Sequence, residues 1–186
     1  MTLLVIGVAL WWGAHLFKRL APAQRAALSA RMGDKSKAIF ATLLLLSVVL
    51  MVLGYRGADF VAVWTPPAAM LHVNNLLMLL AVIFFGMASS KGRMRSWLRH
   101  PMLTGFLAWA VAHLLVNGDL ASIILFGGLG LWAPVAMVAI NRGNPAWTPP
   151  APGPVKGDVR LVLISVVVFA VLGGIHSLLG PWPFPG

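Results

Sequence analysis

The side chains best suited to metal chemistry in this chain are five histidines, namely His15, His72, His100, His113 and His176. The 186 residues include no cysteine and no glutamate, and only four aspartates. Thiolate-ligated metal sites are therefore excluded, and paired-carboxylate chemistry is strongly disfavoured. Imidazole is the remaining side-chain ligand for a soft or borderline metal ion.

Two of these histidines share a local pattern. Residues 11–16 and 109–114 both read Trp-x-x-Ala-His-Leu. Positions four apart lie on the same face of a helix, so Trp11 precedes His15 by one turn and Trp109 precedes His113 in the same way. Two such imidazoles, each beside an indole ring, suit the two sides of a haem better than zinc, which takes three or four clustered ligands. A repeated six-residue pattern of this kind can also arise by coincidence in a chain rich in Trp and Ala.

Two polar residues lie at the two ends of the apolar stretch that carries His113, and each has more than one interpretation. Asn117 follows His113 by one turn, where it can fix the tautomer of the imidazole or end the helix. Arg99 precedes the same apolar stretch, where it can hold a lipid phosphate or a haem propionate. Orientation of the helix in the membrane explains Arg99 equally well.

The composition places these residues in a membrane. Apolar residues make up 60% of the chain and charged residues 10%, whereas a soluble domain carries about 25% charged residues. The net charge is +10, but the basic residues lie between long apolar runs and form no continuous basic face. Nucleic-acid binding is therefore not expected.

Apolar stretches long enough to span a bilayer set the expected fold. We place six of them near 2–17, 38–55, 70–88, 101–118, 120–140 and 160–180. The first lacks a preceding basic region and a following small-residue cleavage site, so it is interpreted as a retained helix. The predicted fold is an all-α, polytopic bundle of six transmembrane helices forming a single membrane domain over residues 1–186. Lipid is its expected partner, and the sequence does not fix its oligomeric state.

The basic residues predict the orientation of the bundle. Of the fourteen Lys and Arg residues, all but Arg56 lie in 18–37, 91–99 and 142–160. By the positive-inside rule these three connections face the cytoplasm and both termini face outward. The proline-rich stretch 141–159 is expected to be extended. Residues 117–119 are expected to form a tight turn between two helices.

Depth in the membrane leaves the partner of His113 open. Counting about 1.5 Å per residue, His113 lies roughly 12 Å below the outer face, His15 roughly 20 Å and His176 roughly 6 Å. Depth favours His176 opposite His113, with His72 nearer still to the surface, whereas the shared pattern favours His15. His113 is common to both pairs.

A family resemblance is carried mainly by residues 98–130, which begin Leu-Arg-His-Pro-Met-Leu and include Trp109, His113 and Asn-Gly-Asp at 117–119. Further landmarks are Gly-Ala-His-Leu at 13–16, Trp-Thr-Pro-Pro at 64–67, Ile175-His176 and Pro181-Trp182. The chain resembles the NnrU family of bacterial membrane proteins over nearly its whole length.

The resemblance implies a bacterial inner-membrane protein, linked by name to nitrite and nitric oxide metabolism in denitrifiers. It also implies kinship with the plant 15-cis-zeta-carotene isomerase, a membrane enzyme with haem b. Histidines matching His15 and His113 are the implicated haem ligands there. The expected function is therefore haem b binding, with redox-linked cis–trans isomerisation of a polyene or another lipid-soluble substrate; electron transfer or sensing is the alternative. The isomerase has a cysteine where this chain has Ala110, which puts sulfur ligation in doubt.

Overall fold

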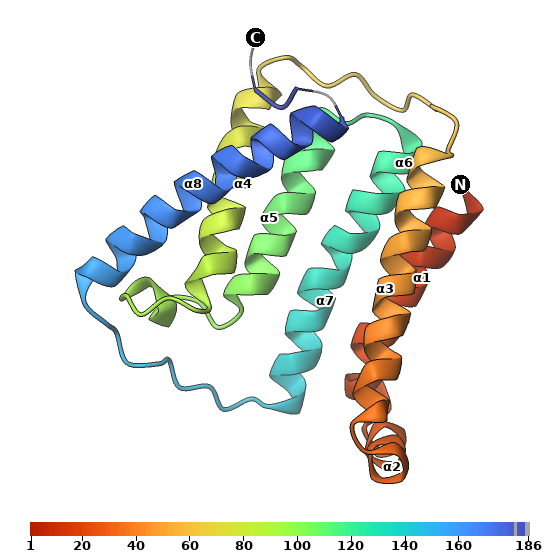
Figure 1. Cartoon of the computed structure of the whole chain (residues 1–186), viewed down its shortest axis with the longest axis vertical. Helices are drawn as coiled ribbons and strands as arrows, with labels where there is room; N and C mark the ends of the chain where they lie inside the picture. The colour runs from red at the N-terminus through yellow and green to blue at the C-terminus, as the bar shows by residue number, and fades with distance from the viewer. Residues whose placement is uncertain (181, 185–186) are drawn as a thin grey trace. The chain divides into compact units, whose positions relative to one another are not determined.

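The computed structural model describes residues 1–180 and 182–184, so Pro181 of the family landmark lies outside the described residues. Within that part of the chain every regular element is helical (Figure 1). An isolated β-bridge pairs Ala62 with Asp119. The elements are α1 (Thr2–Leu20), α2 (Pro22–Met32), α3 (Lys35–Arg56), α4 (Met70–Met87), η1 (Met94–Ser96), α5 (Pro101–Val116), α6 (Leu120–Ser122), η2 (Ile123–Gly127), α7 (Gly128–Gly143) and α8 (Val155–Leu179).

Five helical segments are long and apolar enough to cross a membrane. They are α1, α3, α4, the continuous run Leu120–Gly143 that joins α6, η2 and α7, and α8. A further apolar helix, α5, has 16 residues and is shorter than these. The all-α fold and its membrane character are thus confirmed, and each of the six predicted stretches contains a helix.

The chain forms two compact units. Unit 1 comprises residues 1–63 and 119–145, and unit 2 comprises residues 64–118 and 146–186. Unit 1 therefore holds α1, α2, α3 and the α6–α7 run, whereas unit 2 holds α4, α5 and α8. The expectation of a single membrane domain stays a prediction, and the units are described separately below.

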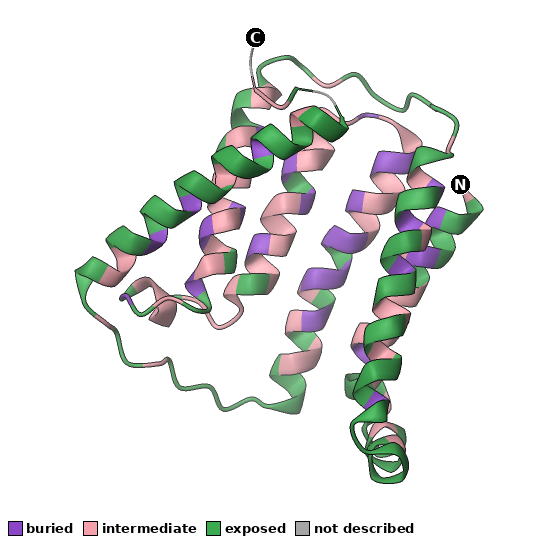
Figure 2. Cartoon of the chain, in the orientation of Figure 1, coloured by how far each residue is buried: buried purple, intermediate pink, exposed green. Residues whose placement is uncertain are grey.

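In unit 1, α1 and α3 pack backbone to backbone. A β-carbon placed on Gly54 would lie 2.2 Å from the backbone nitrogen of Leu4, and one on Gly7 would lie 2.9 Å from the carbonyl oxygen of Ser47. Leu4 and Ser47 are both fully buried, and Figure 2 shows buried residues on the helices of this unit beside exposed ones. Small residues let membrane helices approach closely, because lipid supplies no hydrophobic force between them.

The α7 helix packs against the same α1 helix through glycine. The Trp12 indole N–H donates to the carbonyl oxygen of Gly128 at 2.9 Å. A β-carbon on Gly128 would meet Val8 at 2.8 Å. Gly128 therefore lets α7 approach α1 closely, whereas a β-carbon on Gly127 would meet no atom within 4 Å. Gly127 ends a π-helical turn of five residues. Such turns locally change the side-chain register of a helix.

In unit 2, α4 packs against both α5 and α8. A β-carbon on Gly105 of α5 would lie 2.9 Å from the carbonyl oxygen of Ala81 of α4. On the α8 side, Ile83 and Met87 form a buried cluster with Leu161. The tight approach at Gly105 fixes α5, which carries His113, against α4.

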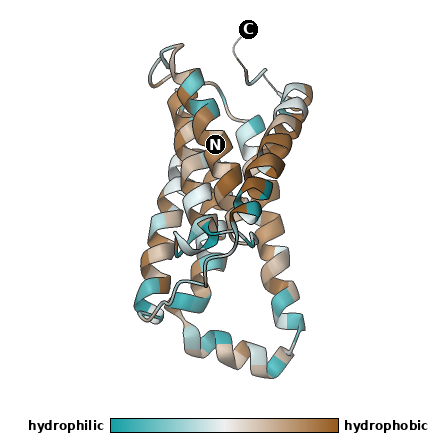
Figure 3. Cartoon of the chain, turned by 90° about the vertical axis from the view of Figure 1, so that its left-hand side faces the viewer, coloured by the Kyte–Doolittle hydropathy of each residue, from teal (hydrophilic) through white to brown (hydrophobic). Residues whose placement is uncertain are grey.

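Many large apolar side chains are not covered by other parts of the chain. Large exposed hydrophobic side chains run along α3 and α8, and the long helices are hydrophobic over much of their length (Figure 3). Lipid tails can cover such surfaces without cost, whereas water cannot. The exposed apolar faces therefore support a membrane-embedded chain.

The structure departs from the sequence prediction mainly between α1 and α3. The sequence predicts a basic connection there without a helix of its own, but α2 occupies Pro22–Met32. Pro22 stands in the first turn and Gly33, with φ +54°, ends the helix. Both are standard boundary signals, but α2 lacks an apolar run and escapes a search for membrane spans. Helix α8 also begins at Val155, earlier than the predicted 160.

Candidate functional site

His15 is held in one tautomer by its own helix. It lies half-buried on α1, and its Nδ1 is 3.0 Å from the backbone carbonyl oxygen of Trp11. A carbonyl oxygen can only accept a hydrogen bond, so Nδ1 must carry the proton. The Nε2 atom then keeps its lone pair, which is the state in which imidazole binds a metal.

Aromatic rings surround the His15 imidazole within unit 1. The Trp11 ring lies 4.1 Å from it at an interplanar angle of 39°. Trp132 of α7 meets the same imidazole edge-on, with centroids 4.7 Å apart, and contacts Trp11 at 5.4 Å. Trp132 was missed by the sequence analysis. The signal available was a tryptophan in the interior of a predicted span, away from the interfaces where this residue usually concentrates.

His113 has the same local arrangement within unit 2. It lies half-buried on α5, and its Nδ1 is 2.9 Å from the carbonyl oxygen of Trp109. The two rings lie 5.2 Å apart at an interplanar angle of 50°, and Phe106 lies 5.1 Å from Trp109. By the same argument as for His15, Nδ1 donates and Nε2 is available to a metal.

Asn117 ends α5. Its backbone N–H and its side-chain amide both donate to the backbone carbonyl oxygen of His113, at 3.0 and 2.8 Å. Of the two roles predicted for Asn117, these contacts display helix capping. The tautomer of His113 is instead fixed by the carbonyl of Trp109, which stands one turn before it.

The other candidate residues are spread over unit 2. Arg99 lies just before α5 and is half-buried, while the His100 carbonyl accepts from both the N–H and the hydroxyl of Thr104. His72 on α4 and His176 on α8 are exposed. Among residues 1–180 and 182–184, no three potential ligands of the His, Asp or Glu type form a metal-binding group.

Comparison with known protein families decides the classification. The chain matches the family described as NnrU protein over residues 3–183. It belongs to the NnrU family. No curated protein and no solved structure matches the chain.

In this NnrU-family chain, a buried amide supports the helix that carries His113. Asn74 of α4 is 7% exposed. In the amide orientation that satisfies both of its polar ends, its nitrogen donates to the backbone carbonyl oxygen of Ala112 at 3.0 Å. Ala112 directly precedes His113, so this bond joins α4 to α5 beside the candidate ligand. Sequence analysis missed Asn74; the available signal was a polar residue within an apolar stretch, which usually faces a neighbouring helix.

The contribution of Asn74 can be measured by replacing it with leucine, which has a similar volume. We expect Asn74→Leu to lower the free energy of unfolding by about 0.6 kcal/mol, and by no more than about 1.7 kcal/mol, because interhelical hydrogen bonds in membranes are modest. Reversible denaturation in mixed micelles would measure it. An unchanged stability would show that the bond to Ala112 contributes nothing.

Proposed function

We propose that this NnrU-family chain binds haem b, with His15 and His113 as the axial ligands. The observation that supports the proposal is that both imidazoles donate Nδ1–H to the carbonyl of a tryptophan one turn earlier. Partners of this kind orient a ligating imidazole and raise its basicity. A shared sequence pattern thus comes with a shared tautomer, and that tautomer leaves Nε2 for a metal at both positions.

The remaining site residues have matching roles in this proposal. Trp11 and Trp109 place an indole beside each ligand and would pack against the edge of the macrocycle. Arg99 would pair with a haem propionate. Asn117 ends the helix that carries His113 and so limits how far that ligand can move. His176 and His72 are the alternates for the second ligand.

The proposed activity is cis–trans isomerisation of a polyene or another lipid-soluble substrate. Bound haem would supply a reversible one-electron change, and the reaction as a whole is redox-neutral. The chain itself would offer an apolar environment reached from the bilayer, consistent with its exposed apolar helices. Ala110 is fully buried and has no ligand atom, so ligation through sulfur is not part of the proposal.

A second candidate function is electron transfer or sensing in nitrite and nitric oxide metabolism. It is favoured by the pre-set tautomers of both His15 and His113. Two strong imidazole ligands leave no open coordination position, which suits electron transfer better than gas binding.

The proposed topology has six spans with both termini on the outer side of a bacterial inner membrane. The sixth span is α5, whose 16 residues rise about 24 Å, somewhat less than a hydrocarbon core of about 30 Å. Neighbouring packed helices and local thinning of the bilayer accommodate a short span.

Optical spectra of the purified protein test the proposal. We expect a low-spin haem spectrum in the oxidised and reduced states, and no change when carbon monoxide is added to the reduced protein, because both axial positions are filled. A carbon monoxide shift would show that one axial ligand can leave, which would favour the proposed isomerase over electron transfer. A colourless protein from haem-replete cells that also fails to bind added haem would contradict haem binding altogether.

A further inference from the structure

The connection between α1 and α3 carries an unusual excess of positive charge. Residues 18–37 hold six Lys or Arg side chains and one acidic side chain, Asp34. Orientation of the helices in the membrane requires positive charge here but no particular arrangement of it. The structure divides these cations into two groups with different surroundings.

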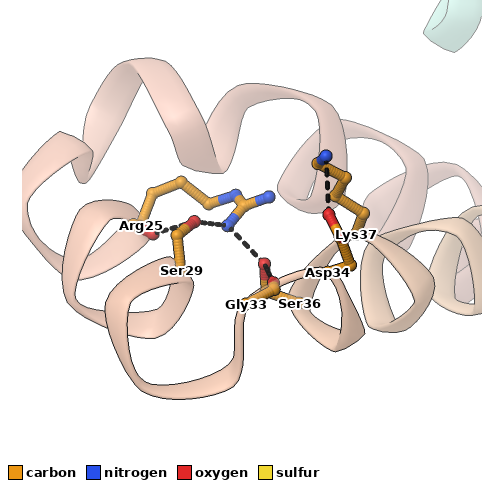
Figure 4. A network of polar contacts seen from close by, with 6 residues as sticks. All are labelled: Arg25, Ser29, Gly33, Asp34, Ser36 and Lys37. Carbon is orange, nitrogen blue, oxygen red and sulfur yellow. Dashed lines mark hydrogen bonds and ion pairs between the residues drawn. The ribbon is translucent and has the colours of Figure 1, made fainter.

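Arg25 belongs to the first group, whose charged side chains contact other side chains of the protein. Its guanidinium donates to the hydroxyls of Ser29 and Ser36 (Figure 4). It also lies 4.6 Å from the centre of the Phe40 ring. Because Ser36 and Phe40 lie on α3, the Arg25 side chain links α2 to the start of α3. Arg25 therefore serves the fold and not an external ligand.

Lys37 is the second cation that has a partner within the protein. It forms an ion pair with Asp34 at 2.8 Å (Figure 4). This ion pair engages Asp34, which is the single acidic side chain of the connection. No other carboxylate within residues 18–37 is left to neutralise the remaining cations.

The second group consists of four exposed side chains. They are Lys18, Arg19, Arg31 and Lys35. In the described part of the chain none of the four makes a hydrogen bond or an ion pair, whereas Arg25 and Lys37 do. They flank α2: two precede it, one lies in its last turn and one begins α3. We call these four residues the α2 cation cluster.

The position of α2 places the cluster at a bilayer surface. Helix α2 connects two membrane-crossing candidates, and its 11 residues rise about 16 Å, too little to cross a core of about 30 Å. Leu20, the last residue of α1, is 75% exposed, and Met32, the last residue of α2, is 37% exposed. Apolar side chains beside lysine and arginine are typical of helices that lie in the headgroup region.

We propose that the α2 cation cluster binds the headgroup phosphates of anionic phospholipids. The charges are complementary, the cations have no internal partner, and Arg25 holds the connection in place. Flanking Leu20 and Met32 favour a lipid over a soluble phosphate, because they can enter the acyl boundary of the same leaflet. The proposal does not depend on haem binding.

Native mass spectrometry of the full chain in neutral detergent tests the site, with phosphatidylglycerol and phosphatidylcholine as the probes. We expect the first phosphatidylglycerol to bind at least about tenfold more tightly than phosphatidylcholine. Each surface cation contributes about fivefold to such binding, so Arg31→Gln with Lys35→Gln should weaken it about 30-fold. Lys18→Gln with Arg19→Gln is a second pair that should act similarly if the first pair misfolds.

The matched control removes two exposed cations from unit 2, namely Lys91→Gln with Lys156→Gln. We expect this control to keep the binding within about threefold. Equal losses from the control and the cluster variants would overturn the proposal, because they would indicate attraction by net charge alone. Equal binding of the two lipids, or displacement of phosphatidylglycerol by glycerol 3-phosphate, would also overturn it.

Discussion

Replacing His113 with alanine is expected to abolish the low-spin haem spectrum and to reduce retained haem by at least about tenfold, since loss of even an outer partner of a metal ligand costs 10–100-fold. His15→Ala is expected to have the same effect. Both changes remove an imidazole whose Nδ1 is already engaged by a tryptophan carbonyl. Absorbance at the haem band relative to protein, measured after purification, gives the result directly.

Rescue separates ligation from folding. His113→Gly opens a space that free imidazole can fill, so adding imidazole should restore the low-spin spectrum if the side chain is a ligand. A merely structural role for His113 would not respond to imidazole. The protein variants should also be compared by thermal unfolding in the same detergent.

His72→Ala and His176→Ala are the controls, because both side chains are exposed. Neither should change the spectrum if His15 is the second ligand. Loss of the low-spin spectrum in His176→Ala, with His15→Ala unaffected, would reassign the second ligand to α8. Retention of the spectrum in both His15→Ala and His113→Ala would end the proposed ligation.

The helices were predictable because their signals are local. Long apolar stretches identify the membrane helices. The tight turn expected at 117–119 is not formed, because Asn117 and Asp119 have extended backbone and Asp119 pairs with Ala62 in an isolated bridge. The hydrogen bond from each His ring to a Trp carbonyl also follows from local geometry. Atoms one turn apart on a helix are neighbours, so the backbone carbonyl of whichever residue stands four positions before a His lies within reach of its ring.

The partners contributed by other helices could not be predicted from one sequence. Trp132 reaches His15 from more than a hundred residues away, and Asn74 reaches Ala112 from a different helix. Such contacts depend on how each helix is rotated about its axis and on which of its faces pack together. An almost uniformly apolar sequence has no hydrophobic periodicity that would reveal those faces. Helix α2 was missed for a different reason, since it carries boundary signals but no apolar face long enough to span the membrane.

Gly54→Ala is expected to destabilise unit 1 by about 1–3 kcal/mol, the usual cost of overpacking a close contact. The new methyl group would lie 2.2 Å from the backbone nitrogen of Leu4 and 2.7 Å from its α-carbon. Backbone atoms cannot turn aside as a flexible side chain does, so α1 as a whole must move away from α3. Alanine also favours helix over glycine by up to about 1 kcal/mol, and the clash must exceed that gain.

Gly174→Ala on α8 is the matched control, because no atom lies within 4 Å of the position that its β-carbon would take. It should gain the helix preference of alanine without a clash, leaving stability unchanged or raised by up to about 1 kcal/mol. Denaturant unfolding of both variants in mixed micelles gives the comparison. If Gly54→Ala were as stable as Gly174→Ala, α1 and α3 would not pack in the close contact described, and the support that α3 gives to the His15 helix would have to come from α7 instead.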